Sequence, residues 1–303
     1  MNGPEVIHGG EAAPADEPDP VAGYPRRIIC LTEETTETLY LLGEGSRIVG
    51  ISGYTVRPPE ARSKPKVSAF INAKFDKILA LEPDLVFAFS DLQAGIASEL
   101  IKRGVAVFTF NQRSVVEILQ MIQTVARIVG AIDRGRALVR RLQAELDAVK
   151  ASASRFSHRP RVFFEEWKDP LISGIRWVDE LIELAGGETV FPDLRKYQSA
   201  KDRVVQPDAV IARDPEVILG SWCGVKVNKN FICSRPGWRA ISAVRNRHVY
   251  EVKSTYILQP GPASLTEGLR QIHAILAHVL KIEPDERLRP DESIDPDVTL
   301  SKT

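Results

Sequence analysis

The chain has 303 residues, and its 40 basic side chains balance its 40 acidic ones to a formal net charge of zero. A balanced charge excludes the electrostatic footprint of a nucleic-acid-binding protein, so we expect no nucleic-acid partner. No stretch approaches the roughly 20 apolar residues of a membrane-spanning helix, so we expect no membrane span. A chain of this length usually folds as about two domains.

The two ends of the chain differ in composition from its middle. Residues 1–23 are rich in Pro, Glu, Asp, Ala and Gly, and residues 283–303 are similarly polar. Both compositions predict disordered tails. Residues 1–23 also lack the basic segment and the apolar core of about 7–15 residues that an export signal needs, which favours a cytoplasmic protein. The alternative is a trimmed mature form, which would be periplasmic.

A first α/β lobe is predicted for residues 24–113. Residues 27–31 indicate a buried strand, and residues 32–35 offer side chains that can cap the helix that follows. Glu33 and Glu34 lie at this strand-to-helix turn, where they can face a cleft. Capping of the helix is their alternative role.

A sequence repeat predicts a second lobe of similar build. Residues 75–87 recur without a gap as residues 207–219, at an offset of 132 residues. The offset pairs Asp76 with Asp208, proline with proline, and aliphatic residues with aliphatic residues. In each copy the proline ends a helix and a continuous apolar run follows. Such a run is typical of a parallel strand that is covered on both faces.

Side chains suited to a binding site follow both repeated strands. Asp91 comes just after the first of them, and Trp222 and Cys223 come just after the second. Ligands of open α/β sheets collect beyond the carboxyl ends of the strands. The two loops are therefore predicted to line a cleft between the lobes.

Residues 114–156 form a helical linker between the lobes. Apolar residues recur through it at helical spacing, and no Gly or Pro occurs between Arg136 and Phe156. Its second half predicts one long rigid helix, which would limit the opening of the lobes.

The second lobe is predicted for residues 157–282. Residues 161–165 indicate a strand and residues 178–185 a helix, in the order found in the first lobe. Gln259 lies in a late loop whose two prolines and glycine fix the backbone, so that the loop can present this side chain to a ligand. A plain helix N-terminus is the alternative.

The sequence predicts no catalysis. It has no Gly-x-Ser-x-Gly elbow, no Walker loop and no Gly-x-Gly-x-x-Gly segment after a strand, so we expect no catalytic residues and no catalytic cofactor. Glu165 and Glu166 are adjacent carboxylates after a strand, and alternation points them to opposite faces, which argues against a shared acid/base task. The histidines lack the spacing of metal ligands, which leaves Cys223 as the one candidate ligand, with packing as its alternative role.

The repeat, the lobe starts and the long linking helix resemble the helical-backbone class, class III, of ABC-transporter substrate-binding proteins. Residues 51–59 and 67–70 are most similar to the vitamin B12 (cobalamin) binding proteins of that class. The resemblance covers about residues 26–280 and implies two Rossmann-like α/β lobes with parallel sheets. It also implies a corrinoid ligand, bound in the cleft without chemical change, and an ABC permease as partner if the protein is exported.

The resemblance assigns ligand contact to residues of both lobes: Tyr54, Phe70, Glu166, Trp167 and Tyr256. Where Phe70 stands the family often has tryptophan, and Trp222 is our candidate for a second aromatic ring that this chain lacks. The resemblance also gives Asp76 and Asp208 the role of paired acids that dock on permease arginines. A stabilising interaction with a helix dipole is the alternative for these acids.

A corrin is a wide, partly apolar ring edged with amides, so its cleft needs aromatic faces and a few polar groups. The aromatic candidates above suit such a ligand. One alternative is a haem or ferric-siderophore binding protein. Another is a cytoplasmic metallocofactor chaperone or enzyme on the same scaffold, for which Cys223, Glu33 and Glu166 would matter more than the rings.

Overall fold

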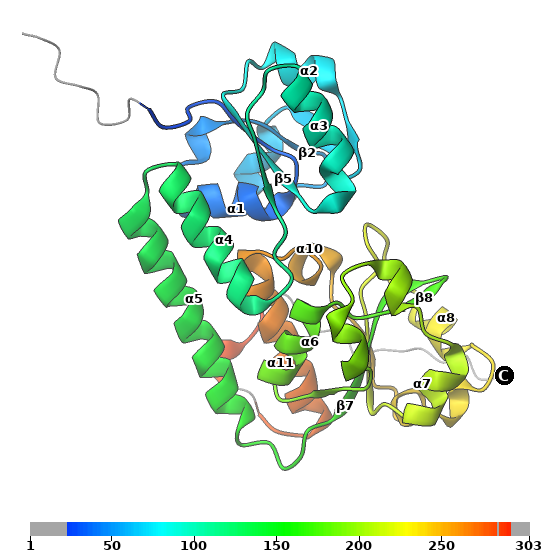
Figure 1. The fold of residues 1–303 in the computed structure, drawn as a ribbon. Coiled ribbons are helices and arrows are strands. Elements are labelled where there is room, and N and C mark those ends of the chain that lie inside the picture. The colour runs from blue at the N-terminus through cyan, green and yellow to red at the C-terminus, as the bar shows by residue number, and fades with distance from the viewer. Residues whose placement is uncertain (1–22, 284, 292–303) are drawn as a thin grey trace, which may run out of the picture.

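The computed structural model describes residues 23–283 and 285–291. It has two α/β lobes joined by a long helix, α5, which runs along one side of the molecule (Figure 1). The predicted fold class is therefore confirmed. The predicted N-terminal tail lies outside the described residues apart from Gly23.

The first lobe is built on a six-stranded sheet in the order β4-β3-β2-β1-β5-β6. All neighbouring strands are parallel except β3 and β4. The buried strands β1 and β5 are apolar throughout because helices cover both faces of the sheet. The elements are β1 (Ile28–Cys30), α1 (Glu33–Leu41), β2 (Ile48–Ser52), β3 (Lys66–Ala69), β4 (Asn72–Ala73), α2 (Phe75–Ala80), β5 (Leu85–Phe89), α3 (Ala94–Lys102) and β6 (Val107–Phe110).

The second lobe has a five-stranded sheet in the order β11-β10-β7-β8, with β9 paired to the start of β7. Its strands are β7 (Arg161–Lys168), β8 (Leu171–Ser173), β9 (Glu188–Thr189), β10 (Val217–Gly220) and β11 (Val249–Glu251). Its helices are α6 (Arg176–Leu184), α7 (Pro207–Arg213), α8 (Lys229–Cys233), α9 (Ser242–Arg245), α10 (Ser254–Ile257), the π-helix η7 (Ser264–Gly268) and α11 (Leu269–Val279). The antiparallel hairpin of β7 and β8 was not predicted, because its turn at Pro170 was taken as a direct link to the helix.

The sequence repeat corresponds to the same unit in both lobes. Its first copy forms α2 and β5, and its second forms α7 and β10. The acids directly before the repeated strands, Asp84 and Glu216, have matching contacts. Asp84 Oδ1 accepts a hydrogen bond from Arg27 N at 3.0 Å, and Glu216 Oε2 accepts one from Arg161 N at 3.0 Å. In each lobe this acid fixes the chain at the start of the first strand.

Two helices connect the lobes, α4 (Val115–Ile128) and α5 (Ile132–Ala153). Helix α5 is unbroken over 22 residues, which confirms the predicted long helix and gives it a length of about 33 Å. It packs against α4 at one end and against α6 and α11 further along. It therefore belongs to the packing of both lobes.

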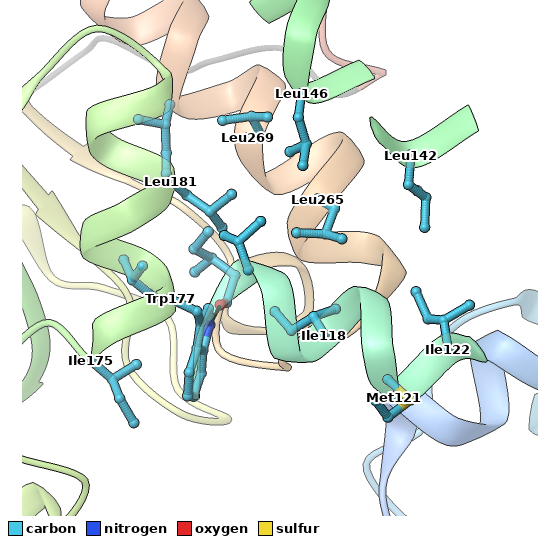
Figure 2. Close-up of a cluster of buried hydrophobic side chains, with 14 of the residues drawn as sticks. Ile118, Met121, Ile122, Leu142, Leu146, Ile175, Trp177, Leu181, Leu265 and Leu269 are labelled. Carbon is cyan, nitrogen blue, oxygen red and sulfur yellow. Dashed lines mark hydrogen bonds between the residues drawn. The ribbon is translucent and has the colours of Figure 1, made fainter. Parts of the chain in front are cut away.

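A continuous apolar core runs from one lobe to the other through these helices. Figure 2 shows its central part, where side chains of α4 and α5 meet those of α6 and of the helix that begins as η7. The labelled residues are Ile118, Met121, Ile122, Leu142, Leu146, Ile175, Trp177, Leu181, Leu265 and Leu269. A shared core makes independent movement of the lobes costly because packed side chains would have to separate.

The lobes also touch directly where the loop before η7 meets α1. A Cβ placed on Gly261 would lie 2.5 Å from Glu34 Cβ and 3.0 Å from Glu34 Cα. Next to it, Glu37 Oε2 accepts a hydrogen bond from Ala263 N at 3.0 Å. Only glycine fits at residue 261 at this separation of the lobes.

Part of the predicted C-terminal tail is packed against the fold. Residues 285–291 contain a short 3-10 helix, η8 (Glu286–Leu288), in which Leu288 is buried in the main core. Asp291 N donates a hydrogen bond to Glu267 Oε2 at 2.9 Å. A single well-placed leucine thus anchors this otherwise polar segment. Residues 284 and 292–303 lie outside the described residues.

We predict that Gly261→Ala lowers the free energy of unfolding by about 1–3 kcal/mol, since the new methyl group overpacks the contact with α1. Urea denaturation measures this change. Gly95→Ala is the matched control, because a Cβ at Gly95 in α3 would meet no atom within 4 Å. We expect the control to keep or slightly raise the stability. Equal stability of the two variants would show that the lobes do not meet as closely as described.

Candidate functional site

A cleft of about 370 Å³ lies between the lobes, within the size range of small-molecule sites. Both lobes contribute to it, mainly from loops that follow strands. Its walls are formed by Thr32, Glu33, Glu34, Phe70, Phe89, Asp91, Leu92, Arg113, Glu166, Trp167, Ile172, Ile175, Trp177, Gln198, Ser199, Ala200, Arg203, Cys223, Leu258, Gln259 and Pro260.

The structure places most of the predicted site residues in this cleft. From the first lobe these are Glu33, Glu34, Phe70 and Asp91, and from the second Glu166, Trp167, Cys223 and Gln259. Phe70, Asp91 and Cys223 lie just beyond strand ends, and Glu33 and Glu34 begin α1 directly after β1. Glu166 and Trp167 lie near the end of β7, and Gln259 lies in the loop before η7. The rule that ligands collect at strand ends therefore located the cleft.

Trp222 does not line the cleft, contrary to the sequence-based expectation. Its side chain is 2% exposed and packs in the core of the second lobe. The indole N–H donates to Glu165 Oε1 at 3.1 Å, and Lys168 Nζ lies 5.2 Å from the ring centroid. A ring held by these contacts cannot present a face to a ligand. Glu165 itself is fully buried and paired with Arg235, on the side of β7 away from Glu166.

Tyr54 and Tyr256 also lie outside the lining. Tyr256 is nearly buried beneath the Arg57 guanidinium, which lies 5.0 Å from its ring centroid. The contact between Arg57 and Tyr256 joins the two lobes, and the Tyr256 ring is not part of the ligand site. Tyr54 is 51% exposed, and its ring lies 3.9 Å from the position of a Cβ on Gly224, next to Cys223. Tyr54 is thus at the rim of the cleft, where it faces the other lobe.

The two tryptophans of the cleft have satisfied indole N–H groups, so neither needs a polar partner from a ligand. Trp167 Nε1 donates to Asp169 O and Trp177 Nε1 donates to Ile257 O, both at 2.9 Å. Phe70 adopts a positive φ of 47°, and its carbonyl oxygen accepts from Gln93 Nε2 at 2.6 Å. This contact holds the Phe70 loop to the floor of the first lobe.

Sequence reasoning missed several residues of the cleft, among them a tryptophan and two arginines. Trp177 belongs to helix α6 and to the main apolar core, yet it lines the cleft while only 3% exposed. Arg113 follows the end of β6 by three residues, so the strand-end rule applied to this strand could have found it. Arg203 comes from a 3-10 turn, η5 (Ala200–Arg203), and carries no such signal.

Two buried carboxyl groups stand at the start of α1. Burial, and then the nearby charge of Glu33, raise the pKa of Glu34 to about 8. Burial also raises the pKa of Glu33, although a hydrogen bond from Ser52 opposes the shift. The hydroxyl of Thr32, the residue before the helix, donates to Glu34 Oε1 at 2.6 Å and does not cap the helix. Glu34 is therefore protonated at neutral pH and can donate a hydrogen bond.

The cleft has no evident metal site. Within residues 23–283 and 285–291, no group of three or more His, Cys, Asp or Glu side chains is placed to hold a metal ion. Burial is the main cause of a raised pKa for Cys223, and the charges of Glu33 and Glu166 add to it. The thiol is thus held in its neutral form, which is a poor ligand.

Asp76 and Asp208 occupy equivalent places outside the cleft. Each lies in the first turn of the helix that precedes a repeated strand, α2 for Asp76 and α7 for Asp208. Both are exposed, and the Asp76 side chain forms an ion pair with Arg103 at 3.9 Å. Each lobe therefore presents one matched acid to solvent.

These features define a two-lobed ligand-binding protein of class III, the helical-backbone class of substrate-binding proteins. They are the two lobes with a shared core, the stiff α5, and the cleft between strand ends. A family comparison agrees: the Periplasmic binding protein family matches residues 28–256, so the chain belongs to that family. It is a substrate-binding protein of the ABC importer type. No helix among the described residues is both long enough and apolar enough to cross a membrane.

Several known proteins are similar to this chain. The "Vitamin B12-binding protein" of Vibrio parahaemolyticus is 28% identical over 243 residues, which are 79% of this chain and 85% of the relative. An ABC transporter substrate-binding lipoprotein of Bacillus subtilis, YvrC, is 26% identical over 260 residues, 82% of this chain and 79% of the relative. A periplasmic heme-binding protein from Roseiflexus sp. RS-1 in apo form has a TM-score of 0.73 at 24% identity, over 84% of this chain and 99% of that one.

We predict that Glu34→Gln makes stability less dependent on pH. The folded protein keeps the Glu34 proton up to about pH 8, whereas the unfolded chain releases it near the ordinary pKa of 4.5. Wild-type stability therefore falls as the pH rises from about 4.5 to about 8, by at most about 1.4 kcal/mol for each unit of the pKa shift. The glutamine keeps the acceptor for Thr32 and has no proton to lose.

Urea denaturation of both proteins at several pH values between 4.5 and 8.5 measures this effect. Asp179, whose pKa burial raises to about 7, contributes a similar slope to both proteins, so the difference between them reports Glu34. We expect the free energy of unfolding of the variant to rise steadily relative to that of the wild type as the pH increases across this range. Parallel curves would mean that Glu34 is ionised in the folded protein.

Proposed function

We propose that the cleft binds a corrinoid, cobalamin or a close relative, and releases it unchanged to an ABC permease. The observation that carries this proposal is a cleft walled by aromatic and aliphatic side chains of both lobes and edged by hydrogen-bonding groups. A corrinoid needs both, because its ring is wide and partly apolar and its edge carries amides. The vitamin B12-binding relatives support this ligand class.

The polar groups of the cleft suit amides. A protonated Glu34 donates to an amide oxygen, and the Gln259 side chain can both donate and accept. Neutral donors bind neutral amides without the desolvation cost that a buried carboxylate carries.

The lining favours a corrinoid over haem. Haem iron is usually held by an axial His, Tyr, Met or Cys thiolate, and the lining residues among those described include only Cys223, which burial keeps neutral. A complete corrinoid brings its own lower axial base, so it needs no such ligand from the protein. The lack of an imidazole or phenol in the lining is thus no obstacle to corrinoid binding.

Haem is the second candidate, since heme-binding proteins share this fold. The residue that would serve it is Tyr54, whose phenol stands at the rim of the cleft next to Cys223 and Gly224. A ferric siderophore is a third ligand of the same class of proteins. A metallocofactor chaperone or enzyme would depend on Cys223 as a thiolate, which the raised pKa disfavours.

The experiment that tests the ligand is a visible-absorbance titration of the purified protein with cobalamin, cobinamide and haem. We expect saturable binding of cobalamin. In Trp167→Ala the binding should weaken by about 1–3 kcal/mol, the scale of one large ring buried against a ligand. Phe231→Ala is the control, because Phe231 is an exposed ring of the same lobe outside the cleft. Saturable binding of haem alone would overturn the corrinoid proposal.

We also propose that Asp76 and Asp208 dock the protein on its permease. Their support is the matched placement on α2 and α7 and their exposure. A partner built from two similar halves would present two similar basic sites to such a pair. Complementary charge would then fix the orientation of the complex and speed its formation.

The charge-reversed double variant Asp76→Arg, Asp208→Arg should abolish corrinoid uptake by cells while the purified variant binds the ligand like the wild type. The reason is that both acids lie outside the cleft, so only the partner contact is lost. Asp133→Arg, Asp147→Arg makes the same charge change on exposed positions of α5 and should leave uptake intact. Normal uptake in the first variant would refute docking by these acids.

We propose that the protein works outside the cytoplasm, because docking acids act only on a partner that they can meet. The expectation of a cytoplasmic protein depends on residues 1–23, which lie outside the described residues apart from Gly23. Fractionation of cells that express the native gene distinguishes the two locations. Recovery of the protein in the cytoplasm would overturn this proposal and the docking proposal with it.

A further inference from the structure

Arg113 is a buried cation without a good partner. It is 9% exposed and lines the cleft, and its buried Nε has no hydrogen-bond partner within residues 23–283 and 285–291. Among the described residues the guanidinium has one ion pair, to Asp91 Oδ1 at 3.6 Å, which is too long for a hydrogen bond. The Asp91 side chain is 82% exposed, so solvent screens this pair.

Arg203, the second arginine of the cleft, has well-placed hydrogen-bond partners. Arg203 donates to both oxygens of Glu166, at 2.6 Å and 3.0 Å, and to Ser173 O at 2.6 Å. The hydrogen bonds of Glu166 therefore go to Arg203, although its charge also acts on Arg113. Arg113 and Arg203 line the same cleft, and the charge of Arg203 acts on Arg113.

The surroundings of Arg113 hold its side chain ready for a ligand. Its guanidinium lies over the Phe89 ring, 4.9 Å from the centroid, which fixes the plane of the donor groups. Burial is the main cause of a lowered pKa for Arg113; Asp91 opposes the shift and Arg203 adds to it. An arginine remains charged at neutral pH. A buried charge of this kind is stabilised by any oxyanion that enters the cleft.

We propose that Arg113 is the residue that recognises an oxyanion carried by the ligand and thereby determines specificity, an inference that rests on the proposed function of the cleft. In a complete cobalamin the oxyanion is the phosphodiester of the nucleotide loop, which cobinamide lacks. In haem it is a propionate carboxylate. The guanidinium fork can donate two parallel hydrogen bonds to either group.

The test compares ligands with and without the oxyanion in wild type and in Arg113→Gln. Cobalamin is set against cobinamide, and haem against its dimethyl ester, with dissociation constants from absorbance titration. We expect Arg113→Gln to weaken cobalamin binding about 10–100-fold, the range of a charge-assisted hydrogen bond, and to leave cobinamide within twofold. Unchanged cobinamide binding also shows that the variant is folded.

Two further variants sharpen the comparison. Arg113→Lys keeps the charge without the fork and should recover only part of the cobalamin affinity. Arg127→Gln removes an equal charge from an exposed position of α4 and should change neither ligand.

The outcomes separate this inference from the proposed function. Equal loss, or no loss, for cobalamin and cobinamide overturns the inference and leaves corrinoid binding in place. A wild type that binds haem and no corrinoid overturns the corrinoid proposal; the inference then holds if Arg113→Gln weakens haem and spares the dimethyl ester, and fails otherwise. Failure of the wild type to bind any of the four ligands overturns both.

Discussion

The structure depends on the contact between α1 and the loop before η7, where the two lobes meet. Gly261 lies against Glu34, Glu37 accepts a hydrogen bond from Ala263, and Arg57 covers Tyr256 while it pairs with Glu37 at 3.3 Å. This contact closes the base of the cleft and removes water from the first turn of α1. The same burial raises the pKa values of the acids there, so lobe contact and site chemistry have one cause.

Lobes that share a core bind a ligand differently from lobes on flexible hinges. The apolar cluster that passes through α4 and α5 would have to come apart for wide opening, and bending α5 would break its hydrogen bonds. The cleft is therefore largely formed before the ligand arrives, which favours rigid, wide ligands over ones that must be wrapped. Preorganisation of this kind reduces the ordering cost of binding.

Much of the fold could be predicted from the sequence because its signals are local. Continuous apolar runs gave the buried strands, the absence of Gly and Pro gave α5, and the repeat gave the equivalence of the lobes. The site was predictable only as far as strand ends locate it. Trp222 also follows a strand, but Glu165 and Lys168 hold it in the core, and these contacts come from residues more than 50 positions away. Arg203 and the π-helical start of α11 likewise depend on tertiary contacts that no local pattern indicates.

The repeat explains how the cleft and the exposed acids Asp76 and Asp208 are connected within each lobe. In each copy an exposed acid, Asp76 or Asp208, lies in the first turn of a helix. A second acid, Asp84 or Glu216, then holds the start of the neighbouring strand by a hydrogen bond, and the chain continues into a strand that ends at the cleft. Each acid is thus fixed relative to its own half of the cleft. Their mutual spacing is fixed by what holds the lobes together, which is α5 and the Gly261 contact. Under the docking proposal, a partner would therefore meet the two acids as a pair with a preset spacing.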